Sequence, residues 1–271
     1  MRKLGCNAQN LLGNDIFKNM ELIKSVGFDS TFFHWDDDVD IEKYMEKANS
    51  LGLEVEAIHA PFNTVNTVWV EGNDGDVYTE KMRRSIKTAA KYNIPVVVLH
   101  TSSGNDVPKT SPIGLLRHKK LIIEAERCGV KIAFENTRII RHLSLLLDYY
   151  KSENVGFCYD TGHEKCYTPG YRFMPLFGDR TFCTHIHDNL GLAETKDISY
   201  RDDLHRIPFD GIIDFERVCK EIKKNGYKGN LTLEVNNREP YCYYKDLTAE
   251  EFYKKAFATA VKLREMVDGG K

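Results

Sequence analysis

The amino-acid sequence predicts an α/β protein of the (β/α)8 (TIM) barrel class, with a single barrel domain over residues 1–271. Three observations lead to this prediction. Eight short apolar runs recur along the chain, amphipathic stretches separate most of them, and eight such strand–helix units fit the length of 271 residues. A barrel of this class typically needs about 250 residues. Because parallel neighbours need a crossover connection, usually a helix, the alternation predicts a parallel sheet.

The predicted strands are short apolar runs. In chain order they cover residues 3–7, 30–35, 53–60, 95–101, 130–137, 155–160, 182–188 and 230–236. Helical periodicity follows the first run, in IFKNMELIKSVG, and the last, in EEFYKKAFATAVKLREMV. The segment TPGYRFMPLFGDR, between the sixth and seventh strands, contains two prolines, so we expect a short or broken helix there. Residues 189–213 are expected to form a long loop, and long loops in compact domains are often functional.

A doubly wound open sheet would show the same alternation of strands and helices. That alternative is weakened because no glycine-rich dinucleotide or phosphate loop follows the first strand. The chain also contains no internal repeat, low-complexity tract or linker. We therefore expect one barrel domain.

Composition and charge limit the classes of partner. Lysine and arginine total 38, aspartate and glutamate total 40, and the formal net charge is -2, so nothing attracts nucleic acid or an anionic membrane in general. The seven cysteines are odd in number, form no C-x-x-C motif and fall largely in apolar runs, which is typical of buried thiols in a reducing cytosol. The start of the chain lacks a signal-peptide core, and no run approaches the roughly 20 apolar residues of a membrane span. A cytoplasmic, soluble protein is expected.

The residues with candidate chemical roles lie at the ends of the predicted strands. Six consecutive strands end in, or close to, a histidine, aspartate or glutamate: His59, His100, Glu135, Asp160, His185 and Glu234. In a barrel these positions converge on the C-terminal rim, where active sites form. Unpaired charges meeting at the mouth of an apolar barrel are costly, and a coordinated divalent cation removes that cost. The pattern therefore predicts a metal site.

Two short motifs extend this set. His163 follows Asp160 by three residues in DTGH, and DDLH contains Asp203 and His205 within the long loop. A D-x-H spacing can place both side chains on one side of an extended segment, and the alternative is a solvated loop. Asp160 also has an alternative role as a helix N-cap, because aspartate and threonine are good cap residues.

Other positions near the strand ends stay open. His187 shares a barrel-facing side with His185, so either histidine can be the ligand. His34 and Trp35 end the second strand and are expected in the wall of a substrate pocket, or in a packed rim.

Taken together, these fragments make the chain resemble the xylose isomerase-like barrel superfamily, which contains sugar-phosphate isomerases and epimerases and the endonuclease IV group of abasic-site nucleases. The resemblance runs from about the third strand to the eighth. It rests on the order and spacing of HAPF, LHTSSG, FENT, DTGH, HIHDN, DDLHRIPFDG and LEV.

The resemblance implies a set of ligands. The four ligands of the epimerase-type single metal correspond to Glu135, Asp160, His185 and Glu234. Mixed nitrogen and oxygen ligation of this kind suits Mn²⁺, Zn²⁺, Co²⁺ or Mg²⁺ as the cofactor. The nuclease branch holds additional zinc ions with residues that correspond to His59, His100, His163, Asp203 and His205.

The chain also departs from both branches. Ketose epimerases carry a glutamate six residues after the first metal glutamate and an arginine six residues after the metal histidine; here these positions are Arg141 and Gly191. The nuclease branch has a tyrosine three residues after the first histidine, where this chain has Phe62.

The leading hypothesis is a metal-dependent isomerase or epimerase that acts on a small-molecule sugar or sugar phosphate through an enediolate. Glu135 and Glu234 are the candidate acid and base, and His163 or His100 would bind substrate hydroxyls or a second metal. A dehydratase that acts through a metal-stabilised enolate would show the same residues. The alternatives are an endonuclease IV-like zinc phosphodiesterase and a non-catalytic metal- or sugar-binding barrel.

Three arginines near the rim complete the list of candidates. Arg138, Arg206 and Arg238 can bind a phosphate group or face water. Neither nucleic acid nor a membrane is expected as a partner, and a homo-oligomer is compatible with the sequence.

Overall fold

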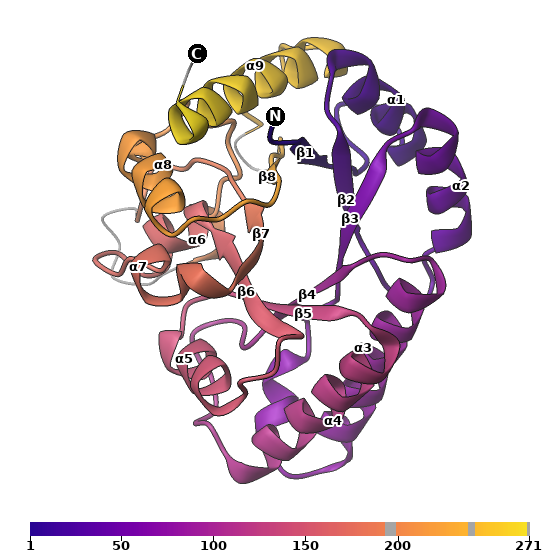
Figure 1. The fold of residues 1–271 in the computed structure, drawn as a ribbon, viewed down its shortest axis with the longest axis vertical. Coiled ribbons are helices and arrows are strands. Elements are labelled where there is room, and N and C mark those ends of the chain that lie inside the picture. Colours follow the sequence, from indigo (N-terminus) through magenta and orange to yellow (C-terminus); the bar gives the residue numbers. More distant parts are fainter. Residues whose placement is uncertain (193–198, 238–241, 270–271) are drawn as a thin grey trace.

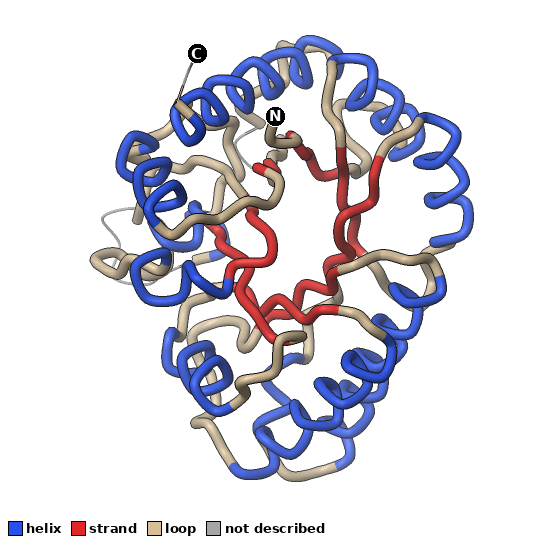
Figure 2. The backbone as a smooth tube through the Cα atoms, in the orientation of Figure 1, coloured by secondary structure: helices blue, strands red, loops and turns tan. Residues whose placement is uncertain are grey.

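A computed structural model describes residues 1–192, 199–237 and 242–269. Eight parallel strands form a nearly closed barrel with the helices outside it, which confirms the predicted fold class (Figures 1 and 2). The strands are β1 Leu4–Asn7, β2 Ser30–His34, β3 Glu54–His59, β4 Val96–His100, β5 Lys131–Glu135, β6 Val155–Asp160, β7 Thr181–His185 and β8 Leu231–Leu233. Their order in the sheet is β7-β6-β5-β4-β3-β2-β1-β8, so every strand lies beside its neighbours in the sequence.

The closure between β7 and β8 is the thinnest part of the sheet. The two strands are joined by a single isolated bridge between Ile186 and Leu233. Its hydrogen bonds run from the Ile186 N–H to the Thr232 carbonyl at 2.8 Å, and from the Glu234 N–H to the Ile186 carbonyl at 3.1 Å. The strands predicted at residues 182–188 and 230–236 extended further than the regular strands β7 Thr181–His185 and β8 Leu231–Leu233.

Helices surround the barrel. They are α1 Ile16–Val26, α2 Ile41–Leu51, α3 Asn73–Lys91, α4 Pro112–Cys128, α5 Ile140–Tyr149, α6 Thr161–Cys166, α7 Met174–Phe177, α8 Phe215–Lys224 and α9 Ala249–Asp268. Short 3-10 turns lie at η1 Val65–Trp69, η2 Gly178–Arg180 and η3 Tyr200–Asp202. Local sequence defines many of the ends: the Asp15 side chain accepts from the Lys18 N–H at the start of α1, and Gly27 ends it in a left-handed conformation.

The sixth strand–helix unit is irregular, as the two prolines predicted. In place of one crossover helix it contains α6, α7 and η2, which have 6, 4 and 3 residues. Pro175 lies in the first turn of α7, where its missing N–H costs no helical hydrogen bond.

The barrel interior is filled by a cluster of mostly small apolar side chains. It consists of Phe32, Ala57, Val96, Val98, Ala133, Cys158 and Cys183. Side chains alternate along a strand, so the residue two positions after each interior residue also points inward, nearer the C-terminal rim. This step leads from Ala133 to Glu135, from Cys158 to Asp160 and from Cys183 to His185. The alternation therefore carries the polar strand ends to the mouth of the barrel.

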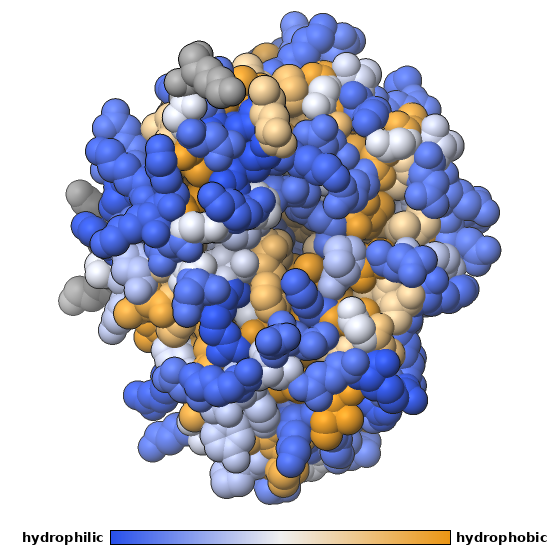
Figure 3. Space-filling view, viewed as in Figure 1, coloured by the Kyte–Doolittle hydropathy of each residue, from blue (hydrophilic) through white to orange (hydrophobic). Residues whose placement is uncertain are grey.

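The face of the molecule seen in Figure 3 is mainly hydrophilic, with polar side chains over the peripheral helices and apolar ones scattered among them. Within the described residues no helix combines the length and apolar character that a membrane span requires. Five cysteines are buried, namely Cys6, Cys158, Cys166, Cys183 and Cys219, while the other two are half-buried.

Candidate metal centre

The strand-end residues predicted from the sequence meet in one buried group at the C-terminal rim. Glu135 ends β5, Asp160 ends β6, His185 ends β7 and Glu234 follows β8 directly. Each offers one ligand atom, and these atoms all lie within 4.8 Å of one another. All four side chains are buried. Three carboxylates and one imidazole form a donor set that suits a divalent cation, so the residues present fit the metal that the sequence predicts.

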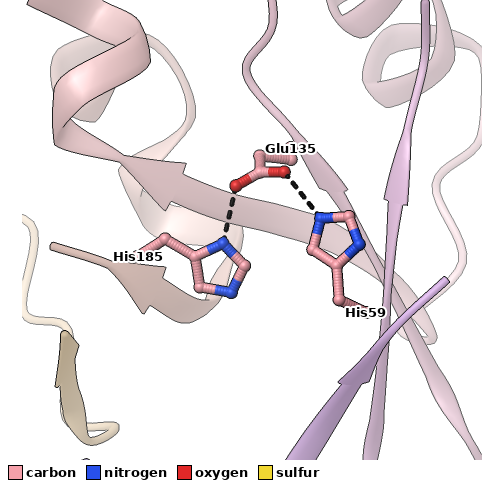
Figure 4. Close-up of side chains that lie close together, drawn as sticks. All are labelled: His59, Glu135 and His185. Atoms are coloured by element: carbon pink, nitrogen blue, oxygen red, sulfur yellow. Dashed lines mark hydrogen bonds and ion pairs between the residues drawn. The ribbon is translucent and has the colours of Figure 1, made fainter. Parts of the chain in front are cut away.

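Glu135 is the centre of this group, because its two oxygens face different neighbours (Figure 4). Oε1 lies 2.6 Å from His185 Nδ1. Oε2 lies 3.2 Å from His59 Nε2 and 2.7 Å from His100 Nε2. His185 Nδ1 is also 3.3 Å from Glu234 Oε2. One carboxylate thus connects the four-residue group to the histidines that end β3 and β4.

A second group of possible ligands lies beside the first. His163, in the first turn of α6, places Nε2 3.4 Å from Asp203 Oδ2, and His205 Nε2 is 2.8 Å from the same oxygen. His205 has a φ of 46°, a left-handed backbone that is uncommon for a residue with a side chain. Its Nδ1 lies 3.0 Å from the Glu234 carbonyl, which orients the ring. The D-x-H motif therefore does place both side chains together, and it does so inside the site.

Asp160 is a helix N-cap and also belongs to the four-residue group of candidate ligands. Its Oδ1 accepts the His163 N–H at 2.6 Å, so it is the N-cap of α6. Its other oxygen lies 3.1 Å from His187 Nε2. Capping fixes the carboxylate, and the fixed carboxylate belongs to the four-residue group, so the two interpretations describe one arrangement.

The structure distinguishes the two histidines of HIHDN. His185 lies within the four-residue group, whereas His187 contacts the second oxygen of Asp160. The His187 ring stacks on His205, with 4.0 Å between centroids and 8° between planes. His187, His205 and Glu234 form another set of close donor atoms. An imidazole binds a metal in its own plane, so two parallel stacked rings are poorly arranged to share an ion.

Glu135, Glu234 and His185 shift one another's pKa values. Burial raises the pKa of Glu135 and of Glu234, but the nearby His185 outweighs it and holds both pKa values below their usual range. Burial lowers the pKa of His185, but Glu234 and Glu135 raise it to about 10. A metal ion uses the imidazole lone pair, so binding here would release the proton that these carboxylates hold on His185.

The second group follows the same pattern. Burial raises the pKa of Asp203, yet His205 and His163 hold it well below its usual range. Burial lowers the pKa of His163, and Asp160 and Asp203 outweigh it and raise that pKa well above its usual value. His100 differs, because its burial outweighs the contact with Glu135 and lowers its pKa. A neutral His100 can offer its lone pair without losing a proton.

A cavity of about 160 Å³ opens above the two groups. Its walls include Glu135, Glu234, Asp203 and the histidines His34, His59, His100, His163 and His205. Phe62 also lines it and stacks on His100 with 4.1 Å between ring centroids. Asp160 and His185 are not among the lining residues and lie deeper.

The structure brings His34 to this cavity but not Trp35. His34 is exposed at the rim, whereas Trp35 is 5% exposed and lines a separate hollow between α2 and α3. The reason is the alternation of side chains, which turns the residue after an inward-pointing one to the opposite side. Trp35 therefore belongs to the packed rim, the alternative that its position left open.

The rim arginines also separate. Arg138 lines the cavity, whereas Arg206 is not among the lining residues and has its guanidinium carbon 4.1 Å from the Tyr243 ring centroid. Arg238 lies outside the described residues. Arg141, at an epimerase position, is exposed on the first turn of α5.

Two polar residues support the site, although no motif had assigned them a role. The Asn136 side chain exchanges two 2.8 Å hydrogen bonds with the Asp160 backbone, and the Asn136 carbonyl lies 2.9 Å from His163 Nδ1. Asp188 accepts four backbone N–H groups, from Asn189, Phe209, Gly211 and Ile213, at 2.8 to 3.1 Å. It thereby fixes the end of the loop that carries Asp203 and His205. The signal for Asn136 was its place directly after Glu135; Asp188 had no comparable signal.

An eight-stranded parallel barrel with carboxylates and imidazoles at its C-terminal end defines a class: (β/α)8-barrel proteins with a candidate divalent-cation centre. A sequence profile of the family described as Xylose isomerase-like TIM barrel matches residues 20–260. The chain belongs to this family.

Relatives agree with that assignment. The uncharacterized protein y4fM of Sinorhizobium fredii is 29% identical, over 92% of this chain and 88% of its own length. Among solved structures, a D-tagatose 3-epimerase-like protein superposes with a TM-score of 0.73 at 20% identity, covering 98% of both chains. The 3-keto-D-glucoside 4-epimerase YcjR of E. coli gives a TM-score of 0.71 at 15% identity, covering 97% of this chain and 100% of its own. At these identities the two structures show that the fold is shared.

Proposed function

We propose that this protein is a divalent-metal-dependent isomerase or epimerase that acts on a sugar or sugar phosphate by proton transfer. One observation carries the proposal. Glu135 and Glu234 belong to the four-residue group of candidate ligands, and both also line the cavity. Two carboxylates at the floor of one cavity can take a proton from a carbon and return it.

Each residue has a role in this mechanism. Glu135, Asp160, His185 and Glu234 would hold the metal, which supplies positive charge that stabilises the oxyanion formed when a proton leaves the carbon beside a carbonyl. Glu135 ends β5 and Glu234 follows β8, and these strands are not neighbours in the sheet, so we propose that the two carboxylates act on different sides of the substrate. One removes the proton and the other delivers it.

The histidines and the aromatic wall would position the substrate. His100 and His163 line the cavity and present ring nitrogens to substrate hydroxyls. Phe62 excludes water above His100, against which it stacks. The relatives support this assignment, since the names of both solved structures refer to sugar epimerases. We place the protein in the cytoplasm, because five of its cysteines are buried thiols. We also propose that the chain forms a single domain.

The test is exchange of a carbon-bound proton with solvent. Metal-loaded protein would be incubated in D2O with a panel of ketoses, aldoses and their phosphates, and deuterium at carbon followed by NMR. We expect one substrate to exchange, with Glu135→Gln and Glu234→Gln each slowing exchange at least 100-fold. Glu56→Gln is the matched control, because Glu56 is a buried glutamate bonded to Thr232 and Asn230 and is absent from the cavity walls.

Metal content must be measured for every variant, because both glutamates are candidate ligands. Exchange that persists in the metal-loaded Glu135→Gln and Glu234→Gln proteins would remove these residues from the mechanism. Absence of exchange on every substrate in the metal-loaded wild type would instead favour a barrel that binds a metal or sugar without catalysis.

A second candidate, metal-assisted phosphodiester hydrolysis, is supported by two of the three further groups of donors found among the described residues. His163, Asp203 and His205 form one, and His59 joins Glu135 and His185 in another. This function requires three metal ions per chain and cleavage of abasic duplex DNA. The formal net charge of -2 argues against a duplex-binding surface. Metal analysis that finds one ion per chain, with abasic DNA left intact, would exclude it.

A further inference from the structure

The wall of the cavity that lies on the loops after β4 and β5 differs from the rest. It consists of Ser102, Ser103 and Gly104 after β4, and Thr137 and Arg138 after β5. The remaining walls are formed mainly by imidazoles, carboxylates and Phe62. We call these five residues the β4–β5 corner. Its side chains are hydrogen-bond donors and one guanidinium, and it contains no carboxylate.

The hydroxyls of the corner keep donors available for a ligand. Ser102 Oγ and Thr137 Oγ1 lie 3.2 Å apart, and both residues are buried. This pair has two hydroxyl protons, and their mutual hydrogen bond uses one, so the second can be donated into the cavity. The Ser103 hydroxyl adds a third donor at the same wall. An anion would satisfy these groups, whereas a neutral apolar ligand would leave them without partners.

The corner is also rigid. Asn66 fixes the backbone of the first loop, because its side chain accepts from the Ser103 N–H at 3.0 Å and donates to the Ser103 carbonyl at 2.7 Å. Gly104 has a φ of 77°, and a Cβ added there would meet nothing within 4 Å, so the wall stays open beside it. A loop fixed in this way presents its hydroxyls at constant positions, which lowers the entropic cost of binding.

Tyr167 and Asn105 are among the neighbours that hold Arg138 in place. Its guanidinium carbon lies 4.5 Å from the Tyr167 ring centroid, and its Nη1 donates to Asn105 Oδ1 at 2.7 Å. Tyr167 in turn stacks on His163, with 4.9 Å between ring centroids. Among the described residues that line the cavity, Arg138 is the only lysine or arginine. A positioned guanidinium with hydroxyl donors on a neighbouring loop is suited to an oxyanion with several acceptor oxygens.

The corner lies directly beside the candidate metal centre. Thr137 and Arg138 follow Glu135 by two and three residues, and His100, which precedes Ser102 by two, contacts Glu135 at 2.7 Å. A ligand seated in the corner can therefore extend to the carboxylates that would move its proton.

We propose that the β4–β5 corner binds the phosphoryl group of the substrate, so that the protein acts on a phosphorylated sugar rather than a free one. This inference rests on the proposed function for the rest of the substrate. The phosphoryl group places its oxygens on Arg138 and on the hydroxyls of Ser102, Ser103 and Thr137. The carbonyl end of the sugar then lies over Glu135 and Glu234.

The first test uses inorganic phosphate and chelator-treated protein, so that no metal ion contributes to binding. Phosphate is titrated into the wild type, Arg138→Met and Arg141→Met, and binding is followed by heteronuclear NMR. Arg141 is the matched control, because it is exposed, lies three residues further along and does not line the cavity. We expect Arg138→Met to weaken phosphate binding at least tenfold and Arg141→Met to change it less than twofold.

Two further variants keep the test decisive if Arg138→Met does not fold. Arg138→Lys keeps the charge but loses the planar fork, and it should bind phosphate with intermediate affinity. Ser103→Ala removes one hydroxyl from a half-buried position and should weaken binding about fivefold, as expected for about 1 kcal/mol. Equal phosphate affinity in all variants, or none in the wild type, would overturn the proposal. Acetate bound as tightly as phosphate would overturn the phosphoryl assignment.

The kinetic test compares each exchanging ketose with its phosphate ester. Arg138→Met should lower kcat/KM for the phosphate ester at least ten times more than kcat/KM for the free sugar; equal losses for both would refute the role of Arg138. The two proposals fail separately. Phosphate binding that depends on Arg138, without any carbon–deuterium exchange, refutes the isomerase and keeps the subsite. Exchange on a free sugar that ignores Arg138 keeps the isomerase and refutes the subsite.

Discussion

Replacing Asp188 by asparagine is expected to destabilise the protein and to release the loop that carries Asp203 and His205. The carboxylate accepts four backbone N–H groups, two on each oxygen. Asparagine keeps one oxygen and turns an NH2 group toward the other two donors. Two buried N–H groups then have no acceptor, at about 1–3 kcal/mol each, so the free energy of unfolding should fall by about 2–6 kcal/mol.

The assay is urea denaturation combined with metal titration by calorimetry. Because Asp188 does not belong to the four-residue group, the metal site formed there should keep most of its affinity. Any second site that depends on Asp203 and His205 should weaken more. Asp210→Asn is the control in the same loop, since Asp210 is half-buried and accepts from the Tyr244 hydroxyl and Lys255 through one oxygen. An unfolding free energy for Asp188→Asn within about 0.5 kcal/mol of the wild type, the scatter of surface substitutions, would refute this reasoning.

Three other perturbations have defined outcomes. In Gly162→Ala the added Cβ would lie 1.8 Å from His187 Cε1, so the His187 ring must move away from Asp160. We expect the free energy of unfolding, measured by thermal unfolding, to fall by about 1–3 kcal/mol and metal binding to weaken about 10–100-fold. Unchanged values would contradict the contact. Burial is the largest influence on Glu56 and raises its pKa above 4.5 despite hydrogen bonds from Thr232 and Asn230. The folded state therefore holds the Glu56 proton more tightly than the unfolded chain does. Stability falls as the pH rises from about 4.5 through the pKa of Glu56 in the folded state. The total loss is about 1.4 kcal/mol for each pH unit between the folded and unfolded pKa values of Glu56. Glu56→Gln should remove this part of the pH dependence in a urea-unfolding series, and an unaltered profile would argue against it. Finally, a chelator should lower Tm, because an ion present at about 100 times its Kd adds about 2.7 kcal/mol to stability, and identical calorimetric scans with and without chelator would speak against a bound ion.

The barrel could be predicted because its determinants are local. Each strand is a short apolar run, and a helical period follows most of these runs. Gly27 and Gly52 then end helices α1 and α2 in left-handed conformations. The polar strand ends were visible for the same reason, since Glu135 and Asp160 end runs that are otherwise mostly apolar. Alternation along the strands then determines which of them point inward.

The rest depends on contacts between segments that are distant in the sequence. Alternation gives His185 and His187 the same side, and only the stacking of His187 on His205 separates them. The four N–H groups that Asp188 accepts come from the following residue and from a loop some 20 residues later, which no local pattern reveals. Trp35 was ambiguous because the sequence alone does not show whether His34 or Trp35 is the inward-pointing member of the pair.

The single bridge that closes the barrel has a consequence for dynamics. His185 stands on one side of the β7–β8 seam and Glu234 on the other, with 3.3 Å between their nearest side-chain atoms. An ion bound to both side chains would link β7 to β8 where the backbone pairing of the sheet is weakest. The amide protons of Ile186 and Glu234, which form that pairing, should then exchange with solvent far more slowly in the metal-loaded protein, while amides in the β4–β5 pairing change little. The rate at which the β7–β8 pairing opens would therefore report whether a metal ion is bound.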